Sequence, residues 1–250
     1  MRLSQPPFFS LLRSGITYDL SGRPLFSMQS KFGQQVDVHF VDKTLYVPKY
    51  GEVTINGNVL FIDGEVQIGE QDFTMYHDAM LENILVGSNI LVIGDGDGGF
   101  TQYDEDFQIY QVEPDPVVMT AASIFFNAQW QRRPSFNVDV RTVEEFIASD
   151  PTKSTAKYDA IILAITDDFN ADAGNFAPVI SLWEDYLKTG GMIIAQVGCI
   201  DDPDFHTYEA NYKSLIAELA TRGREPKTRW FYRFISCFLS DHMFMEIIKS

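Results

Sequence analysis

A glycine-rich stretch follows a short apolar run near the middle of the chain. Ile90 to Ile93 predicts a buried strand, and the next six residues, Gly94-Asp-Gly-Asp-Gly-Gly99, satisfy the spacing G-x-G-x-x-G. Glu113 comes 19 residues after Gly94, at the end of the next predicted strand. Nucleotide-binding folds place an acidic residue there to hold ribose hydroxyls. The pattern predicts a nucleoside-binding loop, and the alternative is a tight turn followed by a solvated acid.

The loop carries two carboxylates, Asp95 and Asp97. A dinucleotide would place its pyrophosphate against this loop, and a carboxylate at roughly 4 to 6 Å repels a phosphate. S-adenosyl compounds have no phosphate and carry a sulfonium and an amine. Asp97 is placed to accept that amine, and Glu113 to take the ribose hydroxyls. The two acids therefore favour an adenosyl-sulfonium ligand over NAD.

The charge balance of the whole chain is strongly acidic. The 250 residues include 19 Lys plus Arg and 35 Asp plus Glu, which gives a net charge of 19 − 35 = −16. Nucleic acids and anionic membrane surfaces reward basic residues, so neither is expected as a partner. A cationic ligand is compatible with this charge, and so is a merely solvated acidic surface.

Other features of the sequence exclude several classes of protein. No apolar run approaches the 18 residues that a membrane span needs, and the N-terminal residues show no signal-peptide pattern. Cys199 and Cys237 are the only cysteines, which fits a reduced, cytoplasmic protein. The four histidines are scattered without ligand spacing, so no metal is predicted.

The order of predicted elements changes near residue 70. Before it, β-branched and aromatic runs predict strands, with hairpin dipeptides at Asn56-Gly57 and Asp63-Gly64. We expect a small antiparallel β domain over residues 1–69. The predicted strands of this domain are 36–41, 44–47, 52–55 and 59–62.

After residue 70, apolar strands alternate with helices. This order predicts an α/β domain over 70–250, with a mostly parallel sheet covered on both faces. Residues 100–108 leave little room for a helix and are expected to form a loop. The predicted helices are 73–85, 116–129, 177–187 and 208–221, and the strands are 90–93, 109–112, 138–140, 160–165, 192–197, 229–238 and 243–248.

Three stretches of the chain together resemble the spermidine synthase family of polyamine aminopropyltransferases. The first is Leu60-Phe-Ile-Asp-Gly-Glu-Val-Gln67 with the following Gly69-Glu-Gln-Asp-Phe73 and Tyr76-His77-Asp78, similar to the family's "LDGxxQ…ERDE…YHE". The second is Val92 to Gly99, similar to "VIGGGDGG". The third is Tyr158 to Ile162, similar to the strand before the family's catalytic loop. The resemblance spans roughly residues 35 to 250.

The resemblance implies an architecture, a substrate and an assembly. The expected fold is a methyltransferase-like Rossmann domain preceded by a small antiparallel β domain. The expected co-substrate is decarboxylated S-adenosylmethionine, with no tightly bound cofactor, and the expected partner is a small cationic amine such as putrescine. Family members are usually homodimers or homotetramers.

The resemblance also implies roles for individual residues. It places Gln67 and His77 against the cofactor, with Gly94 and Gly96 in its loop, and Tyr76 near the aminopropyl group and the polyamine. It likewise places Asp97 on the cofactor amine and Glu113 on the ribose. Without the resemblance, Tyr76 and His77 would be core residues of an apolar helix face, and Gln67 would bond a neighbouring strand.

The chain departs from the family pattern on the acceptor side. The acid that contacts the adenine amine is replaced near Thr142, which the resemblance still places against the cofactor. The first Asp of the family's Asp-x-x-Asp-Pro loop falls on Ala164. An attacking amine needs a proton acceptor, which an alanine cannot supply. Asp167 and Asp168 are the expected substitutes, and Asp78 and Asp167 are expected to hold the cationic acceptor.

Three functions remain open from the sequence. The first is aminopropyl transfer to a polyamine, in which Tyr76, Asp167 and Asp168 would be catalytic. The second is an S-adenosylmethionine-dependent methyltransferase on the same fold. The third is a non-catalytic homologue that binds a nucleoside or a protein partner, having lost its base at Ala164.

Overall fold

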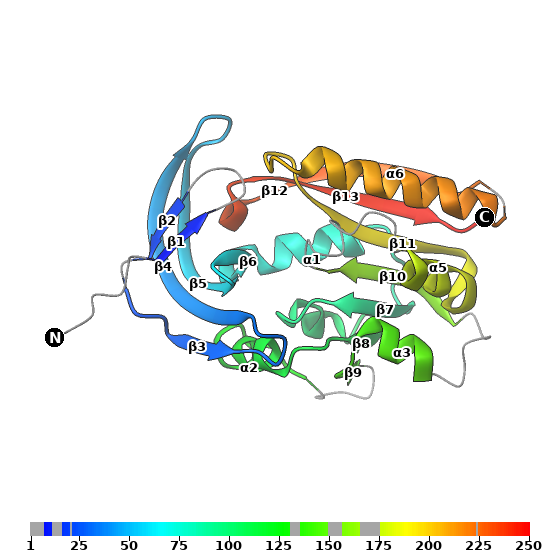
Figure 1. Ribbon diagram of the computed structural model, residues 1–250, viewed down its shortest axis with the longest axis horizontal. Helices are drawn as coiled ribbons and strands as arrows, with labels where there is room; N and C mark the ends of the chain where they lie inside the picture. The colour runs from blue at the N-terminus through cyan, green and yellow to red at the C-terminus, as the bar shows by residue number, and fades with distance from the viewer. Residues whose placement is uncertain are drawn as a thin grey trace.

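The protein contains two main β-sheets, and the smaller one stands at one end of the larger α/β part (Figure 1). The structure is a computed structural model, in which the side chains of 8–11 and 17–20 are not described. It describes residues 8–11, 17–20, 22–130, 136–149, 157–165, 176–223 and 225–250.

The smaller sheet is antiparallel, as predicted, but its strands are longer than expected. Two continuous strands replace the four short ones, because β4 pairs with β5 along its whole length. Asp63-Gly64 forms the predicted turn, with positive φ at both residues. Asn56-Gly57 lies inside β5 instead, so that prediction was wrong. The sheet order is β3 (Phe26–Gln29), β4 (Gln35–Val47), β5 (Gly51–Ile62), β6 (Glu65–Gly69), and β1 (Phe8–Leu11) pairs separately with β2 (Thr17–Leu20).

The larger sheet has seven strands and is mostly parallel, which confirms the α/β fold class. Strands β11, β10, β7, β8 and β9 run parallel to one another. At one edge, β13 pairs antiparallel with β11, and β12 pairs antiparallel with β13. Their bounds are β7 (Asn89–Gly94), β8 (Gln108–Val112), β9 (Phe136–Asp139), β10 (Tyr158–Ala164), β11 (Leu187–Cys199), β12 (Lys227–Ile235) and β13 (Ser240–Ile248).

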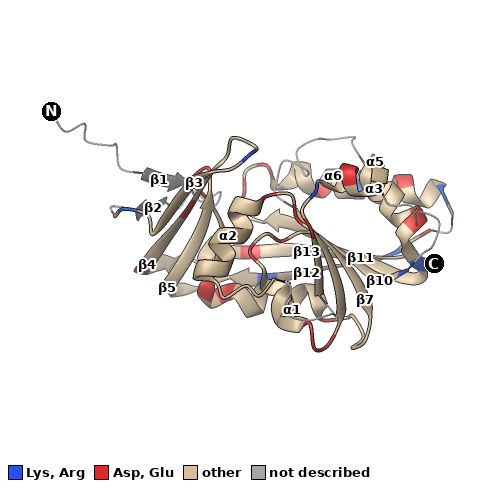
Figure 2. Ribbon diagram, turned by 90° about the horizontal axis from the view of Figure 1, so that it is seen from below, with Lys and Arg blue, Asp and Glu red and all other residues tan. Residues whose placement is uncertain are grey.

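Side chains alternate between the two faces of this sheet, as the period of a strand requires. In β7, Ile90 and Val92 pack on the face of α1 and α2, whereas Leu91 and Ile93 pack on the other face. The two sets of helices are separated in Figure 2. They are α1 (Phe73–Leu81) and α2 (Pro116–Phe125) on one face, and α3 (Val143–Ser149), α5 (Ala177–Ser181) and α6 (Phe205–Thr221) on the other.

Some helix predictions need correction in length. Both α1 and α2 end four residues earlier than expected, at Leu81 and Phe125. Helix α3 was not predicted, and a π-helical turn, Leu182–Tyr186, continues α5. The loop expected after β7 contains one 3₁₀ turn, η2 (Gly99–Tyr103), and no crossover helix. Over the described part of the chain, no helix is both long and apolar enough to cross a membrane.

One apolar core is shared by the two sheets. Val38 and Leu60 of the small sheet belong to the same buried cluster as Met80 of α1 and Ile162 of β10. Burial of this shared surface stabilises both parts at once, at roughly 25 cal/mol per Å² of apolar area. The division into domains at residue 69 therefore stays a proposal.

Asp72 ties the start of α1 to the C-terminal hairpin. Its buried carboxylate accepts hydrogen bonds from the backbone N–H groups of Ser236 at 3.0 Å and Cys237 at 2.7 Å, and from the Ser236 hydroxyl. These donors lie in the turn η4 (Ser236–Phe238), which joins β12 to β13. A single side chain thus fixes two segments that are more than 160 residues apart in sequence.

We predict that Asp72→Ala destabilises the fold by about 2–4 kcal/mol, because it leaves two backbone donors without an acceptor, each at roughly 1–3 kcal/mol. Urea unfolding followed by circular dichroism measures the change. The matched control is Glu52→Ala, at an exposed position of β5, which should change stability by about 0.5 kcal/mol or less. Equal stability of the two variants would contradict the role of Asp72.

Candidate active site

A cavity of about 210 Å³ opens at the carboxyl ends of the parallel strands. Its walls come from the small sheet, the glycine loop, the residues after β8 and β11, and the C-terminal turn. This is the edge at which open α/β sheets bind ligands. The small sheet closes the opposite side through Leu60, Glu65 and Gln67.

The glycine loop needs its glycines for room as well as for conformation. Gly94 and Gly98 have φ of +86° and +78°, which non-glycine residues rarely adopt. A Cβ on Gly94 would lie 2.2 Å from the carbonyl oxygen of Ala164, and one on Gly99 would lie 1.9 Å from the ring of His77. The loop is therefore pressed against β10 on one side and α1 on the other.

A buried glutamine on the neighbouring strand holds the same loop. Gln111 of β8 is fully buried, and its Nε2 donates at 2.7 Å to the carbonyl oxygens of both Gly94 and Asp95. Asp95 itself has φ of +65°, so it adopts a strained left-handed conformation. These contacts offset that strain and fix the shape of the loop.

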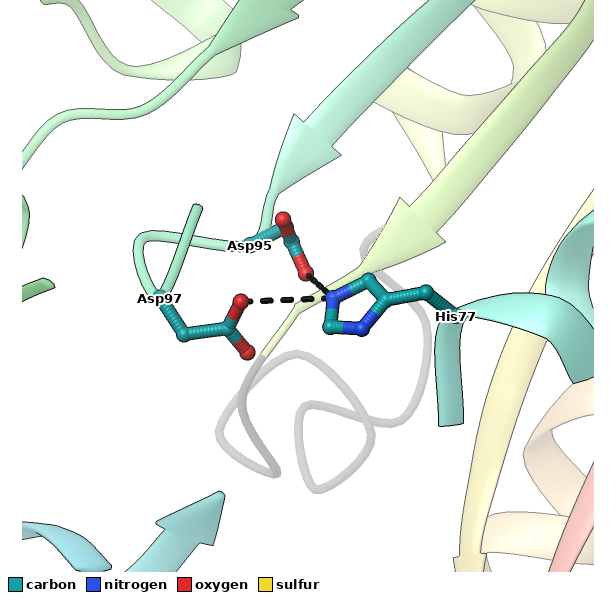
Figure 3. Close-up of side chains that lie close together, drawn as sticks. All are labelled: His77, Asp95 and Asp97. Atoms are coloured by element: carbon teal, nitrogen blue, oxygen red, sulfur yellow. Dashed lines mark hydrogen bonds and ion pairs between the residues drawn. The ribbon is translucent and has the colours of Figure 1, made fainter. Parts of the chain in front are cut away.

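His77 lies buried between the two loop carboxylates (Figure 3). Its Nε2 is 2.7 Å from Oδ1 of Asp95 and 3.2 Å from Oδ1 of Asp97. Its Nδ1 contacts the carbonyl oxygen of Phe73. With Asp95 and Asp97 ionised, both ring nitrogens face acceptors, so both carry a proton and His77 is an imidazolium.

The charges of this cluster explain the directions in which the pKa values of His77 and Asp95 are shifted. Burial by itself would lower the pKa of His77, but the adjacent Asp95 and Asp97 raise that pKa well above the ordinary value of 6.5. Burial, with the charge of Asp97, also raises the pKa of Asp95, which His77 opposes. The cluster therefore keeps its shared proton above neutral pH.

Glu113 follows β8 directly and lines the cavity beside Gly96. Its Oε1 accepts the backbone N–H of Asp115 at 2.7 Å, and Asp115 in turn caps α2 through Val117 N at 2.9 Å. Burial raises the pKa of Glu113 to about 8, and the nearby carboxylates Asp115, Asp95 and Asp97 add to the rise. A cation beside Glu113 would lower that pKa again.

The described wall of the cavity is acidic and contains no Lys or Arg. Its carboxylates come from the small sheet, the glycine loop, the start of α2 and the loop after β11. Such a wall attracts cations and repels phosphates. The acidic residues are Glu65, Asp95, Asp97, Glu113, Asp115 and Asp202.

Three polar side chains in the cavity wall are joined by hydrogen bonds. Tyr76 of α1 donates its hydroxyl to Oε1 of Gln196 on β11, and Nε2 of Gln196 lies 3.1 Å from Nδ1 of His242 on β13. All three residues line the cavity. Asp202, in the loop after β11, adds a carboxylate to the wall that holds these three side chains.

The structure brings five of the sequence-predicted residues into the cavity wall: Gln67, Tyr76, Gly96, Asp97 and Glu113. Gly94 supports the loop from behind, against Ala164. Their roles in binding a ligand stay predictions.

Three predicted positions need correction. His77 does not line the cavity, because it is fully buried behind the glycine loop. Asp78 is exposed and accepts a hydrogen bond from Tyr103 at 2.6 Å, in a separate surface hollow. Thr142 is not in the cavity wall either, since it caps α3 by exchanging hydrogen bonds with Glu145.

The predicted catalytic loop is only partly described. Asp167 and Asp168 lie outside the described residues. Ala164, at the end of β10, lines the cavity as expected for the position of the missing acid.

The sequence reasoning missed Gln111, Gln196 and His242. Gln111 and Gln196 are isolated polar residues near the carboxyl ends of otherwise apolar strands, which is the signal that could have identified them. His242 carries no such signal, because only the pairing of β13 with β11 brings it to the cavity.

His77, Asp95 and Asp97 also form a group whose geometry could hold a metal ion. The contact of 2.7 Å between Nε2 and Oδ1 is that of a charge-assisted hydrogen bond. Two ligand atoms that each lie about 2.0–2.2 Å from one ion are usually farther apart than this. We therefore interpret the cluster as an ion pair.

We predict that Gly99→Ala disrupts the loop, because its Cβ would overlap the ring of His77. The free energy of unfolding should fall by about 3 kcal/mol or more, because a buried ion pair would be displaced. Thermal unfolding measures it. Gly223→Ala is the control, since no atom lies within 4 Å of its Cβ position, and a similar loss there would contradict the prediction.

We predict that stability falls as the pH rises from about 5 to 8. His77 and Glu113 both have folded-state pKa values above their unfolded values, so the folded chain binds protons more tightly. For Glu113 this stability is fully present below the ordinary pKa of 4.5 and is lost as the pH rises to the folded-state pKa of about 8. Melting temperatures should drop across this range, and less steeply in Glu113→Gln than in Glu52→Gln. Identical slopes would contradict the assignment.

Comparisons with known proteins place the fold and the sequence in one family. The chain is 28% identical over 193 residues to a polyamine aminopropyltransferase of Sodalis glossinidius, covering 69% of this chain and 64% of that protein. It is 30% identical over 242 residues to the polyamine aminopropyltransferase of Lachnospira eligens, covering 86% and 76%. No family model matches the chain.

A solved structure agrees at the level of fold. The crystal structure of a probable spermidine synthase from Corynebacterium glutamicum superposes with a TM-score of 0.54 at 14% identity, covering 89% of this chain and 79% of that one. The chain spans only 39% to 64% of the length of the first three curated relatives that it matches. The identity and coverage of the Lachnospira eligens protein nevertheless show that this chain belongs to the polyamine aminopropyltransferase family.

Proposed function

We propose that the protein transfers an aminopropyl group from decarboxylated S-adenosylmethionine to a small amine such as putrescine. Its relatives carry the name polyamine aminopropyltransferase, and one carries the name spermine synthase. The observation that carries the proposal is the acidic cavity at the strand ends, whose described wall has no basic side chain. Both proposed substrates are cations, which such a wall attracts.

The cofactor side of the cavity suits an adenosyl-sulfonium compound. Glu113, directly after β8, is the proposed ligand of the ribose hydroxyls. Gly96 leaves room beside it, since a Cβ there would lie 3.0 Å from the Glu113 carboxyl carbon. Asp97 uses Oδ1 for the backbone N–H of Gly99 at 2.8 Å and for His77, and we propose that its Oδ2 accepts the aminopropyl amine. Gln67 is the proposed contact from the small sheet.

The reaction is an in-line displacement at carbon. The neutral nitrogen of the acceptor forms a bond to the methylene next to sulfur, the C–S bond breaks, and its electron pair goes to sulfur. Methylthioadenosine is the leaving group. Before the attack, the acceptor ammonium gives a proton to a base, which makes the attacking nitrogen neutral. Holding the two substrates in line supplies much of the rate. Asp167 and Asp168 remain the sequence-based candidates for that base.

Two alternatives have some support. A methyltransferase would use intact S-adenosylmethionine in the same acidic cavity. A non-catalytic homologue is favoured by Ala164 in the cavity wall. The cavity beside the glycine loop, however, is lined by residues of both sheets and keeps a volume of about 210 Å³ that side chains do not fill. This volume favours a ligand-binding site.

The proposal also covers the cellular compartment and the oligomeric state of the protein. Both cysteines are free and buried, which suits a reducing cytoplasm. A homodimer or homotetramer is proposed from the family.

Isothermal titration calorimetry with methylthioadenosine and with decarboxylated and intact S-adenosylmethionine tests the proposal, followed by chromatography for spermidine formed from putrescine. We expect the decarboxylated compound to bind more tightly than the intact one, and spermidine to accumulate. Absence of binding by all three compounds would exclude both enzymatic functions. Tighter binding of the intact compound would favour methyl transfer.

We predict that Asp97→Asn and Glu113→Gln distinguish binding of the cofactor amine from binding of the cofactor ribose. Asp97→Asn should weaken decarboxylated S-adenosylmethionine about tenfold more than methylthioadenosine, because methylthioadenosine lacks the aminopropyl amine. Glu113→Gln should weaken both compounds about equally through the ribose. Glu52→Gln serves as the matched surface control. Equal losses for both ligands in Asp97→Asn would show that Asp97 does not bind the amine.

A further inference from the structure

Asp95 occupies a backbone position that favours glycine. Its φ of +65° lies in the left-handed region, which strains an L-residue. The family motif "VIGGGDGG" has glycine at this position, between Gly94 and Gly96. The carboxylate of Asp95 is also removed from water, which by itself is unfavourable for a charged group. A strained and buried charge near a cavity indicates a role that offsets both costs.

The partner of Asp95 is the fully buried His77 (Figure 3). Oδ1 of Asp95 lies 2.7 Å from Nε2 of His77, and Oδ1 of Asp97 lies 3.2 Å from the same nitrogen. These three atoms lie within 4.8 Å of one another. At such distances, away from water, a change of charge on one group alters the electrostatic energy of the other two.

Of the two carboxylates, Asp97 is the one that faces a ligand. Its side chain is 10% exposed, whereas the side chain of Asp95 is 1% exposed. Asp95 as a whole residue is 7% exposed, so it reaches the cavity mainly through its backbone. The Asp95 carboxylate therefore lies behind the loop, and any effect that it has on a ligand must pass through its neighbours.

The charge of the cluster depends on both carboxylates. An imidazolium and one carboxylate form a neutral pair, so without Asp95 the charge of Asp97 would be offset by His77. The second carboxylate brings the cluster to a net charge of −1. Among the described residues, no Lys or Arg lines the cavity wall and changes this balance. An ammonium group that approaches Asp97 thus meets a net negative charge only because Asp95 is present.

We propose that Asp95 neutralises His77 from behind the glycine loop, so that Asp97 binds the amine of the cofactor with its full charge. This inference rests on the proposed function, in which Oδ2 of Asp97 accepts the aminopropyl amine. The strength of amine binding is then set by the net charge of three residues. Asp95 and His77 act through Asp97, so they are positioning residues.

An ion pair with a merely structural role predicts a different outcome. Loss of Asp95 would then loosen the loop and weaken every ligand that binds beside it. Loss of His77 as well would add to the damage. The proposed role instead predicts a loss confined to ligands that carry the amine, and recovery when His77 is neutralised too, because Asp97 alone again gives a charge of −1.

The test uses two unreactive ligands that differ in the amine. S-Adenosyl-3-thiopropylamine carries the aminopropyl amine on a neutral sulfur, and methylthioadenosine carries a methyl group in its place. Isothermal titration calorimetry gives the Kd of each. The Kd of methylthioadenosine divided by that of the amine compound, here called the amine ratio, reports what the amine adds to binding. We expect an amine ratio above one for the wild type.

Asp95→Asn should lower the amine ratio about tenfold, because one negative charge near the ammonium is lost. Asparagine tolerates the left-handed φ and still accepts a hydrogen bond from His77. The double variant His77→Gln with Asp95→Asn replaces the ion pair as a unit and should return the amine ratio to the wild-type value. Glu52→Gln, at an exposed position of β5, is the control and should keep that value.

Three results of the titrations would overturn the inference. They are an unchanged amine ratio in Asp95→Asn, a double variant whose ratio stays as low as that of Asp95→Asn, and a wild type that binds the two ligands equally. A wild type that shows the expected ratios but forms no spermidine would contradict the proposed function and leave the inference standing. If Asp95→Asn fails to fold, Asp95→Gly takes its place, since glycine adopts this φ without strain.

Nitrogen-15 NMR tests the inference without a ligand, and therefore also in a protein that binds neither compound. The chemical shifts of the imidazole nitrogens report how many of them carry a proton. We expect both ring nitrogens of His77 to be protonated in the wild type at pH 7, as the charge balance requires. A neutral His77 ring at this pH would overturn the inference.

Discussion

The site depends on one buried interaction, the imidazolium of His77 held between Asp95 and Asp97. It joins α1, which follows the small sheet, to the loop at the end of β7, and so links the two parts of the protein at the cavity. Removing one partner of a buried ion pair leaves an uncompensated charge, which typically costs about 3–5 kcal/mol. The loop consequently keeps its shape although Asp95 has an unfavourable φ, and Gly99 must stay small to admit the ring.

That cluster also determines what the cavity can bind. Two carboxylates and one imidazolium leave a negative charge behind the glycine loop, and Glu113 and Asp115 add to it from the next strand end. Burial and repulsion from the neighbouring carboxylates raise the pKa values of Asp95 and Glu113. A cationic ligand relieves this repulsion. Tyr76, Gln196 and His242 form a hydrogen-bonded group in the same cavity wall.

The two sheets make the cavity together. Their shared core brings Gln67 of the small sheet and Glu113, after β8 of the large one, into one cavity wall, and Asp72 fixes the C-terminal turn against α1. His242 reaches the cavity only because β13 pairs antiparallel with β11. Residues from four distant parts of the sequence thus depend on one another for their positions.

Local pattern was enough to predict the α/β class, the antiparallel sheet and the glycine loop with Glu113, because strand period and glycine spacing are properties of neighbouring residues. Long-range pairing decided the rest. Asn56-Gly57 favours a turn, but β4 offers it a partner strand, so it stays extended. His77 shares an apolar helix face with Tyr76, and only the tertiary structure shows that one is buried against carboxylates and the other faces the cavity. The sequence determined which chemical groups are present near the strand ends. Which of them meet a ligand was decided by packing between elements, since burial and hydrogen-bond direction depend on contacts that no local pattern contains.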